Sequence, residues 1–162
     1  MPLNDIHIKI DGINGESTVN NHRDEVVVES CNWGVSNPAP VAGGGGGSTG
    51  RAIFADFTFT HRVDRASPLL WKTCATGQAI RTATLSVARS GPAAKDYLTI
   101  KFSEVRVTAV ALADTALDTQ PALESVSFAY AKVDYQYRPQ NPNGSMGAPV
   151  AFRFDLKKNR PL

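Results

Sequence analysis

Residues with reactive side chains are scarce in this chain of 162 residues, which contains two cysteines and three histidines. Cys31 and Cys74 form no Cys-x-x-Cys pair, and no two of His7, His22 and His61 lie at metal-ligand spacing. We therefore predict no metal site and interpret the histidines as strand-surface or hydrogen-bonded residues. A nucleophilic cysteine–histidine pair could arise only if the fold brought the two side chains together.

The two cysteines also indicate little about covalent cross-linking. In a chain made in a reducing compartment, cysteines are usually reduced and behave as small hydrophobic residues. We expect this of Cys31 and Cys74 and expect both to be half-buried. The sequence alone leaves open a disulfide between them.

An excess of charge of one sign is missing as well. Lys and Arg number 17 against 15 Asp and Glu, a formal net charge of +2, whereas nucleic-acid binding requires a dense basic face that displaces counterions. No stretch contains the roughly 18–20 apolar residues that span a bilayer. We predict neither nucleic-acid binding nor membrane insertion.

The N-terminus lacks the parts of an ordinary secretory signal. Residues 1–7 contain neither a basic start nor an apolar run. We expect synthesis and folding in the cytoplasm, and any export would have to use a route other than a cleaved signal.

One glycine pattern matches a nucleotide-binding motif in sequence, but the predicted elements around it do not fit such a site. Gly45, Gly47 and Gly50 match the pattern G-x-G-x-x-G, but a strand is predicted after them, where pyrophosphate binding requires a helix N-terminus. Arg51 follows Gly50 where a P-loop needs Lys and then Ser or Thr. We predict no cofactor, and we interpret the sequon at residues 143–145 as a turn.

What the sequence does contain is a strong alternation of apolar and polar residues. Ile6, Ile8 and Ile10 alternate with His7 and Lys9, which predicts a strand with one apolar face turned inward. Similar runs follow along the chain. The other inward-facing residues that this alternation predicts are Ile53, Phe57, Phe59, Leu85, Val87, Phe152, Phe154 and Leu156.

Two of the predicted strands are unusually long. Residues 97–112 and 123–137 both keep an alternating pattern, but its phase slips near Ser103-Glu104, near Ala109 and between Tyr130 and Val133. A slip within one strand is typical of a β-bulge or of a bend between sheets. Long bent strands fit a barrel or a closed sandwich better than a flat sheet, and the chain length fits one domain, residues 1–162.

One short helix interrupts the strands. Ser67 can cap it, Pro68 suits its first position, and Gly77 can end it.

Two long connections also stand out, at residues 37–50 and at residues 139–149. Such loops are either flexible or ordered by a partner. The first of them contains five consecutive glycines, which are Gly43, Gly44, Gly45, Gly46 and Gly47.

Four motifs follow one another over nearly the whole chain. They are Gly15-Glu16-Ser17 after the first strand, the run from His22 through Asp24-Glu25-Val26-Val27-Val28 to Trp33-Gly34, the segment Asp64-Arg65-Ala66-Ser67-Pro68-Leu69 after a glycine-rich loop and a Phe-rich strand, and Val133-Asp134-Tyr135-Gln136-Tyr137 before a closing strand that ends near Lys157-Lys158-Asn159. In this order they resemble the haemolysin-coregulated protein (Hcp) family, the tube subunit of bacterial type VI secretion systems. The pair Cys31-Asn32 before Trp33 departs from the family pattern.

The resemblance implies a mainly β fold, a small antiparallel barrel of two packed sheets with one short flanking helix. It implies a structural subunit rather than an enzyme: homohexameric rings stack into a hollow tube, which lies inside a contractile sheath, carries a VgrG-type spike trimer and holds effector proteins in its lumen. Contraction would export the subunit without a signal peptide.

The resemblance also assigns roles to individual residues. We expect Asn32 to face cargo, and Asp64, Ser67 and Pro68 to begin the helix. We expect contact with the next ring from the glycines of the first long loop, which are Gly43, Gly44, Gly45, Gly46 and Gly47.

Other functions remain compatible with the sequence. A tail-tube protein of a phage-like contractile particle would follow the same barrel logic. An enzyme using a cysteine or a metal on a β-barrel, or a lectin-like binding module, would instead be a small species with a ligand cleft.

Overall fold

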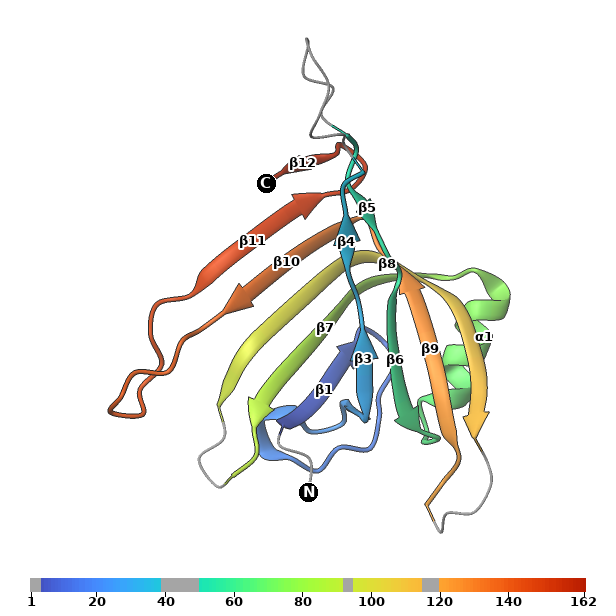
Figure 1. Cartoon of the computed structure of the whole chain (residues 1–162). Coiled ribbons are helices and arrows are strands. Elements are labelled where there is room, and N and C mark those ends of the chain that lie inside the picture. Colours follow the sequence, from blue (N-terminus) through green and yellow to red (C-terminus); the bar gives the residue numbers. More distant parts are fainter. Residues whose placement is uncertain (1–3, 39–49, 92–94, 115–119) are drawn as a thin grey trace.

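The computed structural model describes residues 4–38, 50–91, 95–114 and 120–162 (Figure 1). In these residues the chain forms twelve strands, one α-helix (α1, Ser67–Thr76) and one turn of 3-10 helix (Asn20–His22). The strands are β1 Asn4–Ile10, β2 Val26–Val28, β3 Ser30–Asn32, β4 Val35–Ser36, β5 Ile53–Phe54, β6 Phe57–Arg62, β7 Ala79–Arg89, β8 Asp96–Asp114, β9 Leu123–Ala129, β10 Lys132–Tyr137, β11 Val150–Asp155 and β12 Arg160–Pro161.

The strands enclose a small antiparallel barrel in which β8 is the shared member. One edge of β8 pairs with β7, and the other pairs with both β9 and β10. Pairing continues from β7 to β1 and β2, and from β9 to β6 and β3. Only Glu29 separates β2 from β3, and its backbone N–H donates to the Thr60 carbonyl of β6 over 2.8 Å. The pairings therefore return to their start, as the sequence predicted.

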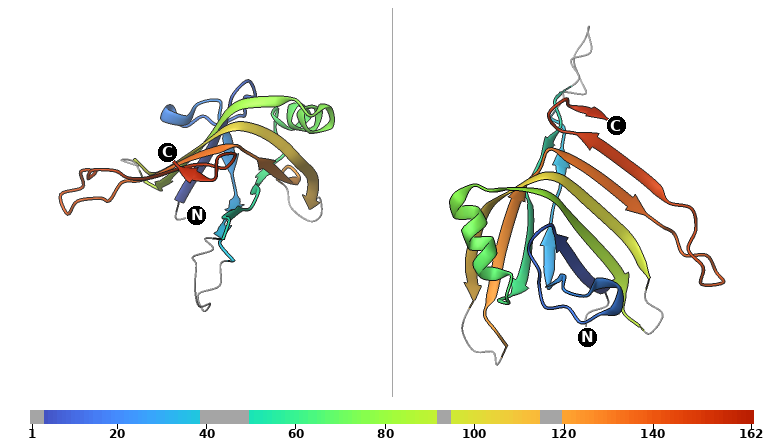
Figure 2. Two further views of the ribbon diagram at one scale, coloured as in Figure 1. Left: turned by 90° about the horizontal axis from the view of Figure 1, so that it is seen from above. Right: turned by 180° about the vertical axis from the view of Figure 1, so that it is seen from behind.

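Three strands extend beyond this barrel. The sheet continues from β8 through β10 and β11 to β12, and this ribbon projects to one side of the molecule (Figures 1 and 2). Its last strand, β12, consists of Arg160 and Pro161. β4 and β5 form a separate two-stranded ribbon that rises from the barrel.

The phase slips predicted in the long strands correspond to real irregularities. Glu104 has φ 54°, a left-handed conformation within β8, and the β8–β9 register shifts between Val107 and Ala109. On the partner side, Tyr130 and Ala131 separate β9 from β10. These breaks let β8 bend so that one half serves the barrel and the other the projecting ribbon.

Helix α1 packs against β8 and begins one residue earlier than the capping hypothesis required. Ala66 occupies the N-cap position, so Ser67 is the first helical residue and Pro68 follows it. No side chain that the structure describes caps the helix. Asp64 Oδ1 accepts the Ala66 N–H over 2.9 Å and Ser67 Oγ accepts the Asp64 N–H over 3.1 Å, so these side chains hold the turn that leads into it. Gly77 ends the helix with φ 68°, which a glycine adopts without strain.

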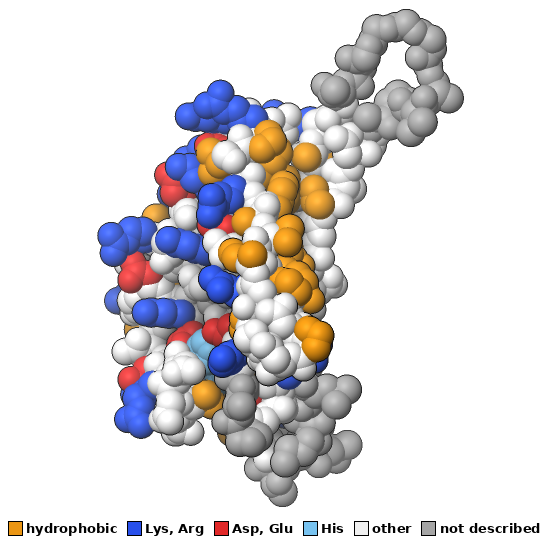
Figure 3. Space-filling model, turned by 90° about the vertical axis from the view of Figure 1, so that its left-hand side faces the viewer, with side chains coloured by type: hydrophobic (Ala, Val, Ile, Leu, Met, Phe, Trp, Pro, Cys, Tyr) orange, Lys and Arg blue, Asp and Glu red, His pale blue; other side chains and the backbone are white. Residues whose placement is uncertain are grey.

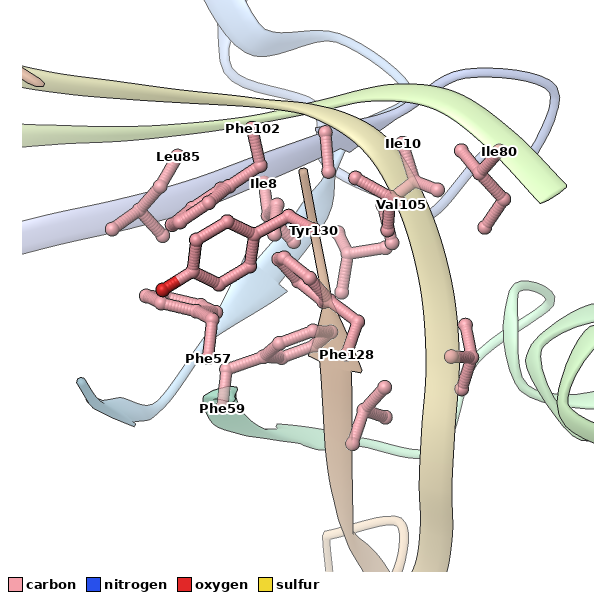
Figure 4. Packing of buried hydrophobic residues seen from close by; sticks show 14 of the residues in the cluster. Ile8, Ile10, Phe57, Phe59, Ile80, Leu85, Phe102, Val105, Phe128 and Tyr130 are labelled. Atoms are coloured by element: carbon pink, nitrogen blue, oxygen red, sulfur yellow. The ribbon is translucent and has the colours of Figure 1, made fainter. Parts of the chain in front are cut away.

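Phenylalanine side chains fill the middle of the barrel (Figure 4). Phe57, Phe102 and Phe128 are almost fully buried, and the Phe57 ring lies 5.0 Å from that of Phe102 and 5.2 Å from that of Phe128. The tilted and edge-on arrangements among these rings suit the quadrupoles of aromatic side chains. Burial of these large side chains is the main favourable term in folding.

The prediction of inward-facing residues from the alternation was wrong for two residues, Ile53 and Phe152. Ile53 is 57% exposed because it lies in the β4–β5 ribbon and not in the barrel wall. Phe152 is 43% exposed because β11 lies in the projecting ribbon. Among the described residues, none of the helices has the length and apolar character needed to cross a membrane.

Gly15 lies where the loop before β2 passes close to another backbone segment. Its N–H donates to the Asp24 carbonyl over 2.7 Å, and a Cβ atom on Gly15 would lie 2.5 Å from the Glu25 carbonyl oxygen. Since backbone atoms cannot yield as a flexible side chain can, a larger residue must displace the loop.

We expect Gly15→Ala to lower the free energy of unfolding by about 1–3 kcal/mol, the usual cost of overpacking. Urea denaturation measures it. The matched control is Gly34→Ala, because a Cβ at Gly34 would have no atom within 4 Å. Equal stability of the two variants would contradict this account of Gly15.

Candidate assembly interface

One apolar face runs without interruption from the core onto β10 and β11. Residues paired across neighbouring strands share a face of the sheet, so each row crosses β8, β10 and β11. The rows are Phe102–Val133–Phe154, then Ile100–Tyr135–Phe152, then Leu98–Tyr137–Val150. Exposure rises along them: Phe102 and Val133 are buried, whereas Tyr137 is 44% and Val150 67% exposed. The core face thus continues into solvent, as is typical of surfaces at which proteins bind one another.

The exposed rows are anchored to the core by a chain of aromatic rings. Phe152 lies 6.0 Å from Phe154, and Phe154 lies 5.1 Å from Phe54 of β5. Phe54 in turn stacks on Trp33, 6.3 Å between ring centroids. Because rings held on several sides have little rotational freedom, binding a partner here costs little side-chain entropy.

A hydrogen-bonded tyrosine holds the inner end of this chain. Trp33 Nε1 donates to the Tyr130 hydroxyl, and that hydroxyl donates to the Ala55 carbonyl over 2.9 Å. Burial raises the pKa of Tyr130 to about 12, so the hydroxyl keeps its proton. The two side chains therefore join the β4–β5 ribbon to the barrel.

The opposite face of the same ribbon is charged. Arg153 Nε donates to Asp134 Oδ2 over 3.1 Å, and Lys132 pairs across the strands with Asp155. Seen from the side on which β11 lies, hydrophobic side chains form a band along one part of the surface, and Lys, Arg, Asp and Glu gather beside it (Figure 3). The β10–β11 ribbon thus has one apolar face, with Tyr137, Val150 and Phe152, and one charged face.

The residues predicted from the sequence lie elsewhere. Asn32 ends β3, is exposed and pairs across the strands with Thr58 of β6. Ser67 and Pro68 are the first residues of α1 and Asp64 lies in the turn before it, away from the projecting ribbon.

The glycines expected to contact the next ring lie outside the residues that the structure describes. Their role between rings therefore stays a prediction. The glycines that lie outside the described residues are Gly43, Gly44, Gly45, Gly46 and Gly47.

The cysteines are both free, so the disulfide that the sequence left open does not form in this structure. Cys74 is half-buried as expected, but Cys31 is exposed on β3. In the part of the chain that the structure describes, no three His, Cys, Asp or Glu side chains are grouped as metal ligands would be.

A hydrogen-bonded cluster around the buried Glu124 joins α1 to the barrel. His61 Nε2 and Trp71 Nε1 each lie 2.7 Å from one oxygen of Glu124, and His61 and Glu124 are almost fully buried. Asp64 Oδ1 lies 3.9 Å from His61 Nδ1, and burial raises the pKa of that carboxyl group. The cluster draws its members from three elements and their connections, which suits a structural role.

A second cluster stacks two of the histidines that the sequence analysis interpreted as strand-surface or hydrogen-bonded residues. The rings of His7 and His22 are nearly parallel, 4.7 Å apart, and both residues are buried. His22 lies 2.7 Å from Glu25 Oε2 and 2.9 Å from Asp96 Oδ1. The cluster ties the loop after β1 to the start of β8. No local sequence pattern predicts this cluster, since Asp96 is far from His7 and His22 in sequence.

The two histidines respond oppositely to their surroundings. Burial and the neighbouring His22 lower the pKa of His7. Burial also acts to lower the pKa of His22, but its hydrogen bonds with Asp96 and Glu25 outweigh this and raise it on balance. His7 therefore gives up its proton at a lower pH than an ordinary histidine, and His22 keeps its proton to a higher pH.

These directions predict the pH dependence of stability. In the unfolded chain His7 regains an ordinary pKa of about 6.5, so the unfolded state binds more protons and the contribution of His7 to stability falls as pH drops below that value. His7→Gln should remove this fall, measured by urea denaturation at several pH values from 5.5 to 7.5.

The matched control is His22→Gln. The raised pKa of His22 adds stability that is complete below about pH 6.5 and is lost as pH rises through its folded value. This variant should therefore lose most stability relative to wild type at the acid end. Parallel pH profiles for both variants would contradict the assignment.

Comparison with known proteins places this arrangement in context. A family model described as "Type VI secretion system effector, Hcp" matches residues 7–137. A solved structure of a type six secretion system protein has 28% identity and a TM-score of 0.90, with 98% of this chain and 99% of that chain covered. None of the curated proteins matches the chain.

Two further solved structures are similar over almost their full lengths. Hcp1 from Salmonella typhimurium is 29% identical with a TM-score of 0.80, and the match covers 99% of this chain and 100% of that one. A type VI secretion system effector from Yersinia pestis is 33% identical with a TM-score of 0.74, covering 93% and 99%.

Proposed function

Because the chain belongs to the Hcp family of type VI secretion proteins, we propose that it is the structural subunit of a secreted tube built from stacked homohexameric rings. The observation that carries this proposal is the apolar face of β10 and β11, which continues the barrel core into solvent. A neighbouring copy would complete that core by covering Tyr137, Val150 and Phe152.

A ring requires that this face meet a different surface of the neighbour. In a heterologous contact each subunit offers one patch to the left and another to the right, and rotation closes the ring. The side of the molecule opposite β11 carries α1, with Leu69 and Trp71 exposed, and the end of β8, with Leu112 exposed (Figure 1). We propose that exposed apolar side chains on this side, Leu69 among them, form the second patch that meets the neighbour.

Stacking of rings would depend on the glycine-rich segment. The β4–β5 ribbon rises from one end of the barrel, and it holds the chain on both sides of the segment that contains Gly43, Gly44, Gly45, Gly46 and Gly47. A glycine backbone can adopt whatever path a neighbouring ring demands. Ordering it would cost conformational entropy, which would make the contact between rings weak.

The lumen would hold effector proteins loosely. Asn32 is our candidate for a side chain that faces them, because it is exposed at the end of β3 and carries an uncharged polar group. Modest polar contacts allow many cargoes to bind and leave.

The remaining partners follow from the same machine. The tube would carry a VgrG-type spike trimer at its tip and lie within a contractile sheath, whose contraction expels both. Contraction would thereby export the subunit together with the spike. The matched family model and structures are of type VI secretion proteins, which favours this function over a phage-like tail tube.

We expect Phe152→Asp to abolish ring formation while leaving the barrel folded, because a carboxylate would enter the apolar contact. Light scattering after gel filtration and electron microscopy measure the assembly. The matched control is Ala151→Asp, which adds the same charge to the opposite face of the same strand. Rings of unchanged size in both variants would contradict the proposed interface.

The heterologous geometry has its own test. Leu69→Asp spoils the second patch, so it should also stop ring closure. Mixing it with Phe152→Asp leaves one intact contact between unlike variants, and the mixture should yield dimers. Mixtures that stay monomeric would argue against pairing of these two patches.

Deleting Gly43 to Gly47 should weaken contact between rings and leave each ring intact. The expected result is hexamers that no longer associate at high concentration, measured by sedimentation velocity. Removing Gly144 and Ser145 from the other long loop is the control. Loss of the rings themselves would show that the segment acts within a ring and not between rings.

A further inference from the structure

A cavity of about 280 Å³ lies where β7 and β10 end and β8 begins, beside the last row of the apolar face. The side chains that shape it are Arg89, Lys95, Tyr97, Tyr137, Arg138 and Gln140. Its size suits one or two side chains of a ligand, since sites for whole small molecules begin at about 300 Å³.

The lining carries positive charge without a matching acid. Arg89, Lys95 and Arg138 supply three cations, and none of the described residues that line the cavity is Asp or Glu. Two carboxylates lie close to the lining residues, and each has a partner: Asp5 accepts from Ser90 Oγ, at the cavity wall, over 3.2 Å, and Asp96, next to Lys95 in the chain, pairs with His22. A carboxylate entering the cavity would therefore meet several donors able to form charge-assisted hydrogen bonds.

Contacts around Tyr97 hold Arg89 and one wall of the cavity in place. The Arg89 guanidinium lies 6.0 Å from the centre of the Tyr97 ring, and its Nη1 donates to Gln140 Oε1 over 3.3 Å. Tyr97 meets Tyr137 edge-on at 6.5 Å, and the Arg138 N–H donates to the Tyr97 carbonyl over 2.8 Å. Such preorganisation lowers the entropic cost of binding.

We propose that this cavity binds an acidic peptide segment, in which a carboxylate lies among Arg89, Lys95 and Arg138 and an adjacent apolar side chain packs on Tyr97 and Tyr137. Tyrosine and arginine are the residue types enriched where proteins bind proteins. Met146, which also lines the cavity, adapts to varied shapes. Phosphate sites instead rely on helix N-termini or backbone N–H nests, and the lining elements here are strands and their turns.

This site extends the proposed function and does not depend on ring formation. An acidic segment held here would attach its protein to the subunit at a place separate from Asn32. The chemistry recognises a class of sequence, acidic residues beside apolar ones, and so would accept more than one carried protein.

The test is fluorescence anisotropy at low salt with a labelled synthetic peptide, Glu-Leu-Asp-Glu-Leu-Asp, and its neutral counterpart Gln-Leu-Asn-Gln-Leu-Asn. The wild-type protein should bind the acidic peptide and should not bind the neutral one. Arg138→Ala and Lys95→Ala should each weaken binding about tenfold, the scale of one lost charge-assisted contact. Arg138→Lys should restore part of the affinity.

The matched control is Arg160→Ala, which removes the same charge from β12 outside the cavity and should leave binding unchanged. Equal weakening by Arg160→Ala and Arg138→Ala would overturn the site, because it would show attraction to net charge alone. Absence of acidic-peptide binding to the wild type would overturn it as well.

A third arm separates peptide from phosphate. Unlabelled tripolyphosphate is tested for binding that depends on Arg138. If tripolyphosphate binds in this way and the peptide does not, the cavity is a phosphate site and the peptide proposal is overturned. Gel filtration of each variant is run alongside. Rings that persist while peptide binding is lost confirm the site independently, and binding that persists without rings would reject only the proposed assembly.

Discussion

The backbone groups along both edges of a barrel strand must find hydrogen-bond partners, and the way in which β8 meets this requirement determines the arrangement of the other strands. Its 19 residues pair with β7 along one edge and with β9 and then β10 along the other. The left-handed Glu104 and the break at Tyr130 and Ala131 allow one strand to serve both the barrel and the ribbon. The exposed apolar face exists because β8 is longer than the barrel that it helps to close.

The sequence predicted the barrel because its evidence is local. Alternation in β1, the slips at Ser103-Glu104 and Ala109, and the glycine that ends α1 each follow from neighbouring residues. The prediction of Ser67 as the cap was wrong by one residue, because Ala66 takes the N-cap position and a turn held by Asp64 precedes it. The exposure of Phe152 was not predictable, since alternation marks an apolar face without saying what covers it.

The site was harder to predict for the same reason. Its chemistry comes from rows of residues on β8, β10 and β11 that are remote in sequence, and from Trp33 and Phe54 beside a separate ribbon. The histidine stack likewise joins His7, His22 and Asp96 through tertiary contacts. Family resemblance supplied the ring and the tube as expectations, but the surface that could build them is visible only in three dimensions.

The short strand β12 bears on how such a subunit avoids uncontrolled growth. An open sheet edge is a template on which further strands can add without limit, as in amyloid. Here the sheet ends at Arg160 and Pro161, and a proline lacks the N–H that an incoming strand would need. Copies must then meet through their side-chain faces, whose fixed angles favour a closed and countable polymer over an endless fibre of backbone ladders.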